Sequence, residues 1–283
     1  MHPFALTTTR VLWTLCFASH LVLLIVLLGR ERTRRFPFFT ASIALMALRL
    51  LFEMLLVGRL SMMPLQSVLL TSANLGVLAA LLVLIEVARQ SLPQMTAKNW
   101  LQIAPLLALL SAAALRWWGP LPKAGDLVVH SQMDVLRFLQ LLWQKGQLFS
   151  DLLTVGFCIV ALCLIRRVKF GWRNHSVLIL FGLTLLSAAW LGMTGYWMIL
   201  SHRVTPGISR EEYQHIISIG TMLYNGYRIT VIVAAVWWIA ALWTEEPTEA
   251  KAAQNVEDTA SAALPLASEQ AEAVPAEAPE NNA

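Results

Sequence analysis

Seven apolar runs, each about as long as a membrane-spanning helix, follow one another along the chain. About 20 helical residues cross the hydrocarbon core of a bilayer. A spanning segment is helical because lipid offers no partner for backbone N–H and C=O groups. The pattern therefore predicts an all-α polytopic membrane protein in which residues 1–243 form a seven-helix transmembrane bundle. The predicted spans are about residues 11–29, 38–57, 67–88, 100–116, 146–165, 177–200 and 216–243.

Basic side chains gather in two connections between these runs, at residues 30–35 and 166–173. Short loops rich in arginine and lysine remain cytoplasmic, because moving their charges across a bilayer is costly. Both loops follow an odd-numbered run, so the sequence predicts an N-terminus outside the cell and a C-terminus in the cytoplasm. The residues expected to fix this topology are Arg30, Arg32, Arg34, Arg35, Arg166, Arg167, Lys169 and Arg173.

Two of the connections carry signals for the start of a helix. Ser131 stands three residues before Asp134, and the same spacing separates Ser209 from Glu212. In such a capping box the serine oxygen accepts an early backbone N–H, and the acid reaches back toward the serine. The first box predicts a helix that begins outside the fifth span and continues through it. This helix would be about 50 Å long if Gly146 does not break it.

The composition supports a membrane protein, because 57% of the residues are hydrophobic, only 13% are charged and the mean hydropathy is +0.62. Soluble domains contain about 25% charged residues. Residues 1–243 hold 20 Lys and Arg against 8 Asp and Glu. We expect this basic excess to meet the anionic head groups of the lipid bilayer, and we expect no nucleic-acid partner.

The composition changes at residue 244. Residues 244–283 are rich in Ala, Glu and Pro, and hold one Lys against nine acidic residues. Such a segment cannot bury enough apolar surface to fold, so it predicts a disordered acidic cytoplasmic tail. Two interpretations of the tail stay open. It is either a solvated tail with no specific role or a segment that docks a cytoplasmic protein partner.

Several ionisable residues fall inside the apolar runs, where they are costly and mark candidate functional sites. With a rise of about 1.5 Å per residue, polar groups of four helices fall about 17–22 Å from the predicted cytoplasmic ends. Arg49 and Glu53 stand four residues apart and can pair on one helix. We also predict that Asp151 pairs with Arg228 between the fifth and seventh helices. The candidate ligand-binding or polar-layer residues are Arg49, Glu53, Asn74, Asp151, Tyr227 and Arg228, with Tyr224 and Asn225 as further hydrogen-bond partners.

This polar layer has two interpretations. It could form a pocket, open to the outside, that binds a small polar or anionic ligand. It could instead be a set of interhelical hydrogen bonds that stabilises the bundle. The sequence leaves both open.

The chain lacks the usual signals of cofactor and catalytic chemistry. A b-type haem needs paired histidines on facing helices, and His20 stands alone deep inside a run, so we expect a hydrogen-bonded core histidine. The three cysteines lie in apolar runs and are expected to be small buried hydrophobes. No HExxH, P-loop, GxSxG or dinucleotide-binding pattern occurs. We expect no cofactor, no metal and no catalytic residue.

Two local pairs give further expectations. Glu86 and Arg89 are spaced to form an ion pair at the inner end of the third run, with contact to a cytoplasmic partner as the alternative. Ala188 and Gly192 are small residues four positions apart, which would let a neighbouring helix approach the sixth run closely.

Three short stretches together resemble a known family. They are Arg-Phe-Pro-Phe-Phe at 35–39, Leu-Ile-Glu-Val-Ala-Arg at 84–89 and Phe-Gly-Trp-Arg-Asn-His at 170–175. Over about residues 11–243 the chain resembles an uncharacterised family of seven-helix inner-membrane proteins from soil bacteria. The resemblance implies a seven-helix bundle in the bacterial inner membrane and supplies no catalytic residues. A looser likeness is to seven-helix sensory modules of bacterial signalling proteins, whose kinase or cyclase domain has no counterpart in this sequence.

Two functions follow as hypotheses. The first is a non-enzymatic inner-membrane protein, receptor-like or scaffold-like, whose polar layer senses a molecule and whose tail or loops meet a partner. The second is a small-molecule transporter or intramembrane enzyme that uses Glu53 and Asp151 to carry protons.

Overall fold

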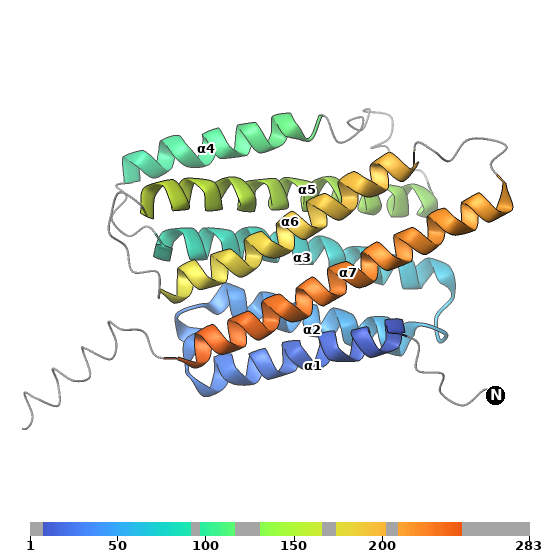
Figure 1. Cartoon of the computed structure of the whole chain (residues 1–283), viewed down its shortest axis with the longest axis horizontal. Helices are drawn as coiled ribbons and strands as arrows, with labels where there is room; N and C mark the ends of the chain where they lie inside the picture. The colour runs from blue at the N-terminus through green and yellow to red at the C-terminus, as the bar shows by residue number, and fades with distance from the viewer. Residues whose placement is uncertain (1–7, 92–96, 117–130, 166–173, 202–208, 245–283) are drawn as a thin grey trace, which may run out of the picture. The chain divides into compact units, whose positions relative to one another are not determined.

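Figure 1 shows a computed structural model of the chain, which describes residues 8–91, 97–116, 131–165, 174–201 and 209–244. Every regular element in these ranges is a helix, as the apolar runs predict. The helices are α1 (Thr8–Gly29), the 3-10 helix η1 (Arg32–Arg34), α2 (Pro37–Leu56), α3 (Met62–Ser91), α4 (Ala97–Ala114), α5 (Gln132–Ile165), α6 (His175–Ser201) and α7 (Arg210–Trp243).

The chain divides into two units, Met1–Trp243 and Thr244–Ala283, at the position where the composition changes. The first unit contains all the helices named above. Residues 245–283, predicted to be a disordered tail, lie outside the described residues. The second basic loop also lies outside them, with Arg166, Arg167, Lys169 and Arg173.

Six of the helices are long and apolar enough to cross a membrane: α1, α2, α3, α5, α6 and α7. The helix α4 is apolar but shorter. These lengths agree with a polytopic membrane protein, because a helix needs about 20 residues to cross the hydrocarbon core.

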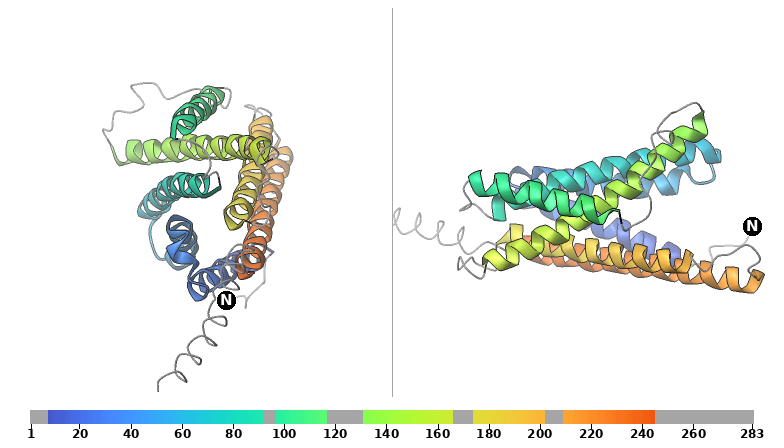
Figure 2. Two further views of the ribbon diagram at one scale, coloured as in Figure 1. Left: turned by 90° about the vertical axis from the view of Figure 1, so that its left-hand side faces the viewer. Right: turned by 90° about the horizontal axis from the view of Figure 1, so that it is seen from above.

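Successive helices run in opposite directions (Figure 1). We call the end where α1, α3, α5 and α7 begin the first end of the bundle, and the end where α2, α4 and α6 begin the second end. α3 packs between α2 and α5, and α7 packs between α1 and α6. α4 packs on α5 at the edge of the bundle (Figure 2, left).

The long helices α5 and α7 start where the sequence predicts. The backbone N–H of Asp134 donates to Ser131 Oγ at 3.3 Å, and the Ser131 hydroxyl donates to Asp134 Oδ2 at 2.8 Å. At the start of α7 the backbone N–H of Glu212 donates to Ser209 Oγ at 3.2 Å. Both serines thus supply an acceptor to a backbone N–H that has no partner within its own helix.

The helix α5 continues through Gly146 without a break over 34 residues, about 51 Å. A Cβ placed on Gly146 would lie 3.2 Å from Val77 Cγ1 of α3. The glycine therefore serves the close packing of α3 on α5 rather than a kink.

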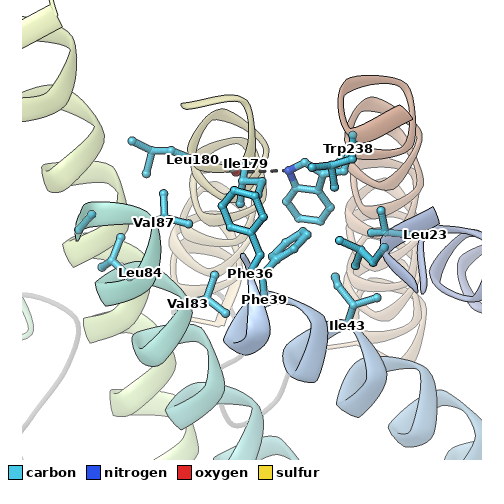
Figure 3. Close-up of a cluster of buried hydrophobic side chains, with 14 of the residues drawn as sticks. Leu23, Phe36, Phe39, Ile43, Val83, Leu84, Val87, Ile179, Leu180 and Trp238 are labelled. Carbon is cyan, nitrogen blue, oxygen red and sulfur yellow. Dashed lines mark hydrogen bonds between the residues drawn. The ribbon is translucent and has the colours of Figure 1, made fainter. Parts of the chain in front are cut away.

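A cluster of buried hydrophobic side chains (Figure 3) lies toward the second end of the bundle. Its side chains come from α1, α2, α3, α5, α6 and α7, so one apolar core joins six helices. Its labelled members in Figure 3 are Leu23, Phe36, Phe39, Ile43, Val83, Leu84, Val87, Ile179, Leu180 and Trp238.

Trp238 of α7 is the largest side chain of this cluster and meets α6 at a glycine. Its Nε1–H donates to the Ile179 carbonyl at 3.3 Å, and its ring packs edge-on to Phe39 with 5.1 Å between centroids. A Cβ on Gly182 would overlap the indole. Gly182 therefore leaves the space that Trp238 fills.

The sequence predicted a close helix approach at a different place on α6. Ala188 is exposed, and a Cβ on Gly192 would meet no atom within 4 Å. The prediction at Ala188 and Gly192 is therefore wrong for this structure, and the close contact of α6 lies at Gly182 instead. Spacing of small residues alone does not tell which side of the helix faces a neighbour.

Glu86 of α3 holds the start of α2. Its two carboxylate oxygens accept the backbone N–H groups of Phe38 and Phe39, at 3.1 and 2.9 Å. The side chain is only 7% exposed. The prediction of a surface ion pair with Arg89 is wrong, because Glu86 instead satisfies two N–H groups that an α-helix leaves unpaired in its first turn. The negative charge also favours the positive end of the α2 dipole.

The first basic loop packs against neighbouring helices. Arg30 lies over the ring of Trp243 at the end of α7, with 5.0 Å from its guanidinium carbon to the ring centroid. The Arg35 carbonyl accepts the Nε2–H of Gln90 from α3 at 2.6 Å. Arg32 is buried. The loop thus joins the second ends of α1, α2, α3 and α7.

We expect Gly182→Ala to lower the free energy of unfolding by about 1–3 kcal/mol, because the added methyl overlaps a buried indole that the core holds in place. Gly192→Ala, on the same helix with open space around it, should change stability by less than about 1 kcal/mol. Thermal unfolding in mild detergent measures both. Equal losses from the two variants would contradict this account of the α6–α7 contact.

We expect Glu86→Ala to destabilise the protein by about 1–3 kcal/mol, because it leaves two backbone N–H groups of α2 without their acceptor. The matched control is Arg89→Ala, one turn away and exposed, which should have little effect. The same unfolding assay compares them. If Arg89→Ala costs as much as Glu86→Ala, the surface pair would be the correct description.

Candidate functional site

Arg228 of α7 joins three helices near the first end of the bundle and is 8% exposed. Its Nη2 lies 3.9 Å from Glu53 Oε1 of α2, and its Nη1–H donates to the Thr9 carbonyl of α1 at 3.2 Å. Its guanidinium lies over the Tyr224 ring, 4.7 Å from the centroid. One cation thus connects α7 with both α1 and α2.

Asp151 of α5 has other partners than the sequence predicted. Its Oδ2 accepts the Nε2–H of Gln147 at 3.0 Å, and its Oδ1 accepts the hydroxyl of Ser187 from α6 at 2.8 Å. The side chain is 5% exposed. The predicted pair with Arg228 is therefore wrong. Both carboxylate oxygens of Asp151 have partners, and the bond from Ser187 joins α6 to α5.

Asn74 of α3 forms a hydrogen bond to α5. Its amide donates to the Leu70 carbonyl of its own helix at 2.9 Å and to the Leu139 carbonyl of α5 at 3.0 Å. It thus fastens α3 to α5, one of the roles that the sequence left open for the polar layer.

Arg49 and Glu53 do not form the predicted ion pair within α2, because Glu53 faces Arg228 instead. Arg49 lies within electrostatic range of the Tyr227 hydroxyl, as does Asp151. Charged groups of α2 and α5 therefore act on Tyr227 of α7 at a distance, although the ion pairs differ from the predicted ones.

A cavity of about 690 Å³ opens beside this polar layer, between α5, α6 and α7 and near the first turn of α1. Its volume lies within the range of about 300–1,000 Å³ that small-molecule sites have. It is lined by Thr9, Trp143, Gln144, Lys145, Leu148, Trp190, Met193, Thr194, Trp197, Met198, Ser201, Ile217, Gly220, Thr221, Leu223, Tyr224 and Asn225.

Aromatic rings form much of the cavity wall. Trp190 packs edge-on against Trp143, with 6.1 Å between ring centroids. Trp197 lies against Gly220 of α7, where any Cβ would overlap its ring. Side chains of this type give a flat, apolar surface with a few polar edges, which is suited to a planar ligand.

The cavity and the polar layer share side chains. Tyr224 lines the cavity and carries Arg228 on its ring. Trp190 lines the cavity and contacts Tyr227, with 5.0 Å between ring centroids. A molecule in the cavity would therefore touch residues that hold the polar layer in place.

Few polar atoms converge on the cavity. Lys145 brings a positive charge. Asn225 brings an amide oxygen that is buried and has no hydrogen-bond partner. Hydroxyl groups come from Thr9, Thr194, Ser201 and Thr221. This arrangement can bind and orient a small molecule with a mostly apolar body.

The residues considered for cofactors lie in the core. His20 is 4% exposed, and its Nδ1 lies 2.7 Å from the Cys16 carbonyl, which confirms a hydrogen-bonded core histidine. Cys16 and Cys158 are buried, whereas Cys163 is exposed on α5 and departs from the prediction. Among the described residues, no group of three His, Cys, Asp or Glu side chains could hold a metal ion.

Sequence reasoning missed the cavity itself. Lys145 stands one residue before the predicted fifth span, 146–165, and so was not counted among the residues inside the membrane. Trp143 and Trp197 lie near the ends of predicted spans, where tryptophans are usually interfacial. Trp190 lies near the middle of the predicted sixth span, so this explanation does not apply to it. A signal was present in Gly220, because a glycine inside a helix often marks a close approach.

No family model, no curated protein and no solved structure matches this chain.

We expect a double-mutant cycle to separate the observed pair from the predicted one. Glu53→Gln combined with Arg228→Gln should show a coupling of at least about 0.5 kcal/mol in the free energy of unfolding, because the two side chains face each other. Asp151→Asn combined with Arg228→Gln should be additive within about 0.3 kcal/mol. Detergent unfolding of the single and double variants measures both cycles. A larger coupling in the second cycle would restore the predicted pair.

Proposed function

We propose that this protein is a receptor-like, non-enzymatic protein of the bacterial inner membrane that binds a small molecule from the outer side. The single observation that carries the proposal is the aromatic cavity of about 690 Å³ between α5, α6 and α7. Its volume and mostly apolar walls with a few polar groups are those of a ligand site.

Seven spans with an outside N-terminus fit this proposal. α3 and α5 both begin at the first end of the bundle, so the chain must cross the bundle once more after α3 before α5 can begin (Figure 1). α4 is the helix that lies between them in the sequence. The 18 residues of α4 measure about 27 Å. The arginines between α1 and α2 support a cytoplasmic second end, because short arginine-rich loops stay on that side of the membrane. The cavity at the first end then faces outward.

The contacts around the cavity support a receptor-like role. Tyr224 carries Arg228, which bonds to the Thr9 carbonyl of α1 and faces Glu53 of α2. A ligand against Tyr224 would thus act on three helices at once. α7 ends at Trp243, and the proposed cytoplasmic tail follows it directly in the sequence.

The alternative, a transporter or intramembrane enzyme with proton-carrying carboxylates, receives less support. Neither Glu53 nor Asp151 is among the residues that line the cavity. Both oxygens of Asp151 accept hydrogen bonds from neighbouring side chains. A carboxylate held in this way is better suited to joining α5 and α6 than to exchanging protons with a ligand.

We expect the Thr221→Cys variant to react with a membrane-impermeant maleimide added to intact cells, because Thr221 is exposed and lines the cavity. The matched control is Gly29→Cys at the second end, where a Cβ meets no atom within 4 Å. It should react only after the membrane is permeabilised. The wild-type protein, whose three cysteines lie inside α1 and α5, serves as the blank.

Two outcomes would contradict the proposal. Labelling of Gly29→Cys but not Thr221→Cys in intact cells would reverse the orientation. Failure of Thr221→Cys to react in both intact and permeabilised cells would show that the cavity has no opening to water.

A further inference from the structure

Two of the hydroxyl groups that line the cavity are already used by their own helices. The Thr221 hydroxyl donates to the Ile217 carbonyl at 3.0 Å, and the Ser201 hydroxyl donates to the Met198 carbonyl at 2.8 Å. A serine or threonine inside a helix can satisfy its hydroxyl in this way, on a carbonyl three or four residues earlier. These two side chains therefore have no donor left for a ligand.

Four other polar side chains of the cavity wall form no side-chain hydrogen bond within the described part of the chain: Thr9, Gln144, Thr194 and Asn225. Thr9 and Gln144 are exposed, whereas Thr194 and Asn225 are half-buried. The Thr194 hydroxyl does not bond back to its own helix as that of Thr221 does, and Asn225 Oδ1 is buried without a partner. A polar group taken out of water without a hydrogen bond is costly. Thr194 and Asn225 therefore gain most from a ligand that supplies hydrogen bonds.

These four side chains lie at one level of the bundle. Counted from the second end at about 1.5 Å per residue, they stand about 27–32 Å along α1, α5, α6 and α7. The hydrocarbon core of a bilayer is about 30 Å thick. With the second end in the cytoplasm, this polar level falls at the outer boundary of the hydrocarbon core, beside the lipid head groups.

The wall below the polar level is apolar. Leu148 and Trp190 lie about 22–26 Å from the second end by the same count. The Trp190 ring offers a flat apolar surface there, on which another ring can pack. A ligand that fits both levels has a polar group at one end and an apolar ring at the other.

The four side chains of the polar level favour an uncharged ligand. None of them carries a charge, and no Asp or Glu lies in the described wall of the cavity. Lys145 also lines the cavity, but it already has an interaction partner in the protein, so its charge does not define the ligand. Hydroxyl and amide side chains both donate and accept hydrogen bonds, which suits a hydroxyl group on the ligand.

We propose that the cavity binds an uncharged amphiphile that reaches it from the outer leaflet, with an apolar ring against Trp190 and a hydroxyl end hydrogen-bonded to Thr194 and Asn225. This inference rests on the proposed function, and it adds the chemical class of the ligand.

The test uses three probes that share one ring system: 2-naphthaleneethanol, 2-ethylnaphthalene, which lacks the hydroxyl, and 2-naphthaleneacetate, which is an anion. Binding is measured by equilibrium dialysis of the full-length protein in phosphatidylcholine nanodiscs, and empty nanodiscs give the concentration of each probe in the lipid. Relative to that concentration, the alcohol should bind at least about fivefold more tightly than either other probe, which corresponds to about 1 kcal/mol. Equal or stronger binding of the hydrocarbon or of the anion would overturn the inference, as would no binding of the alcohol.

Variants of the cavity wall assign the preference to its residues. Thr194→Val and Asn225→Leu should each lower the affinity for the alcohol by about three- to tenfold, because each removes one hydrogen bond, and should leave the affinity for 2-ethylnaphthalene unchanged. Thr221→Val is the matched control and should change neither affinity by more than about twofold, because the Thr221 hydroxyl already donates to Ile217. Thermal unfolding in mild detergent checks that the three variants are folded. Equal effects of Thr194→Val and Thr221→Val would overturn the assignment.

A bilayer lipid is the competing occupant. Lipids retained by the wild-type protein are identified by mass spectrometry before and after saturation with 2-naphthaleneethanol. A lipid that stays bound at saturation, and that is lost when Thr221→Cys is modified with the maleimide, would make the cavity a lipid site and overturn the inference. Release of the lipid by the alcohol, or the absence of a retained lipid, supports the uncharged amphiphile.

The maleimide-modified Thr221→Cys protein separates failure of this inference from failure of the proposed function. If all three probes bind equally and the modification abolishes binding, the cavity is a ligand site that has no preference for a hydroxyl, and only the inference fails. If the modification leaves binding unchanged, the probes bind elsewhere, and both the inference and the proposed function lose their support.

Discussion

The structure depends on one constraint: polar groups carried into the interior of an apolar bundle need partners there, because lipid supplies none. Glu86 meets this need for the first turn of α2. Asn74 and Asp151 meet it between α3 and α5 and between α5 and α6. Each such bond also fixes how one helix lies against the next. The arrangement of the helices therefore follows from these pairings as much as from apolar packing.

The two ends of the bundle satisfy this constraint differently. The second end has a dense core in which six helices contribute apolar side chains around Trp238 and Phe39 (Figure 3). The first end has long helices and large aromatic rings with a cavity among them. A buried amide oxygen of Asn225 remains without a partner there. Buried polar atoms without a hydrogen-bond partner also occur at the second end, at Gln90 and Ser91. The cavity is therefore the feature that makes the first end the better place to receive a ligand.

Sequence reasoning was most successful where local chemistry decides the structure. Apolar runs and capping serines gave the helices and the starts of α5 and α7, because these depend on neighbouring residues. The prediction that Asp151 pairs with Arg228 was wrong. The position of a residue along the helix axis follows from counting residues. The direction of its side chain around the axis changes by about 100° from one residue to the next. If the predicted alignment of two helices is wrong by one or two residues, every predicted contact between them is therefore wrong.

The same limit explains why Glu86 and the cavity were missed. The i,i+3 spacing of Glu86 and Arg89 describes one helix in isolation, whereas the start of α2 reaches Glu86 only in the folded chain. The cavity is made by residues of four helices, and its charged member, Lys145, lies at the margin of a predicted span. No spacing within one segment reports such a convergence.

The seat of Trp238 in the space left by Gly182 has a consequence for how α6 and α7 can move. A ring that fills the place of a missing side chain on the facing helix resists sliding of one helix along the other, because that space exists at one position only. The arrangement recurs in the opposite sense nearer the first end, where the Trp197 ring of α6 fills the space at Gly220 of α7. With one ring supplied from each side, α6 and α7 are held in a single register.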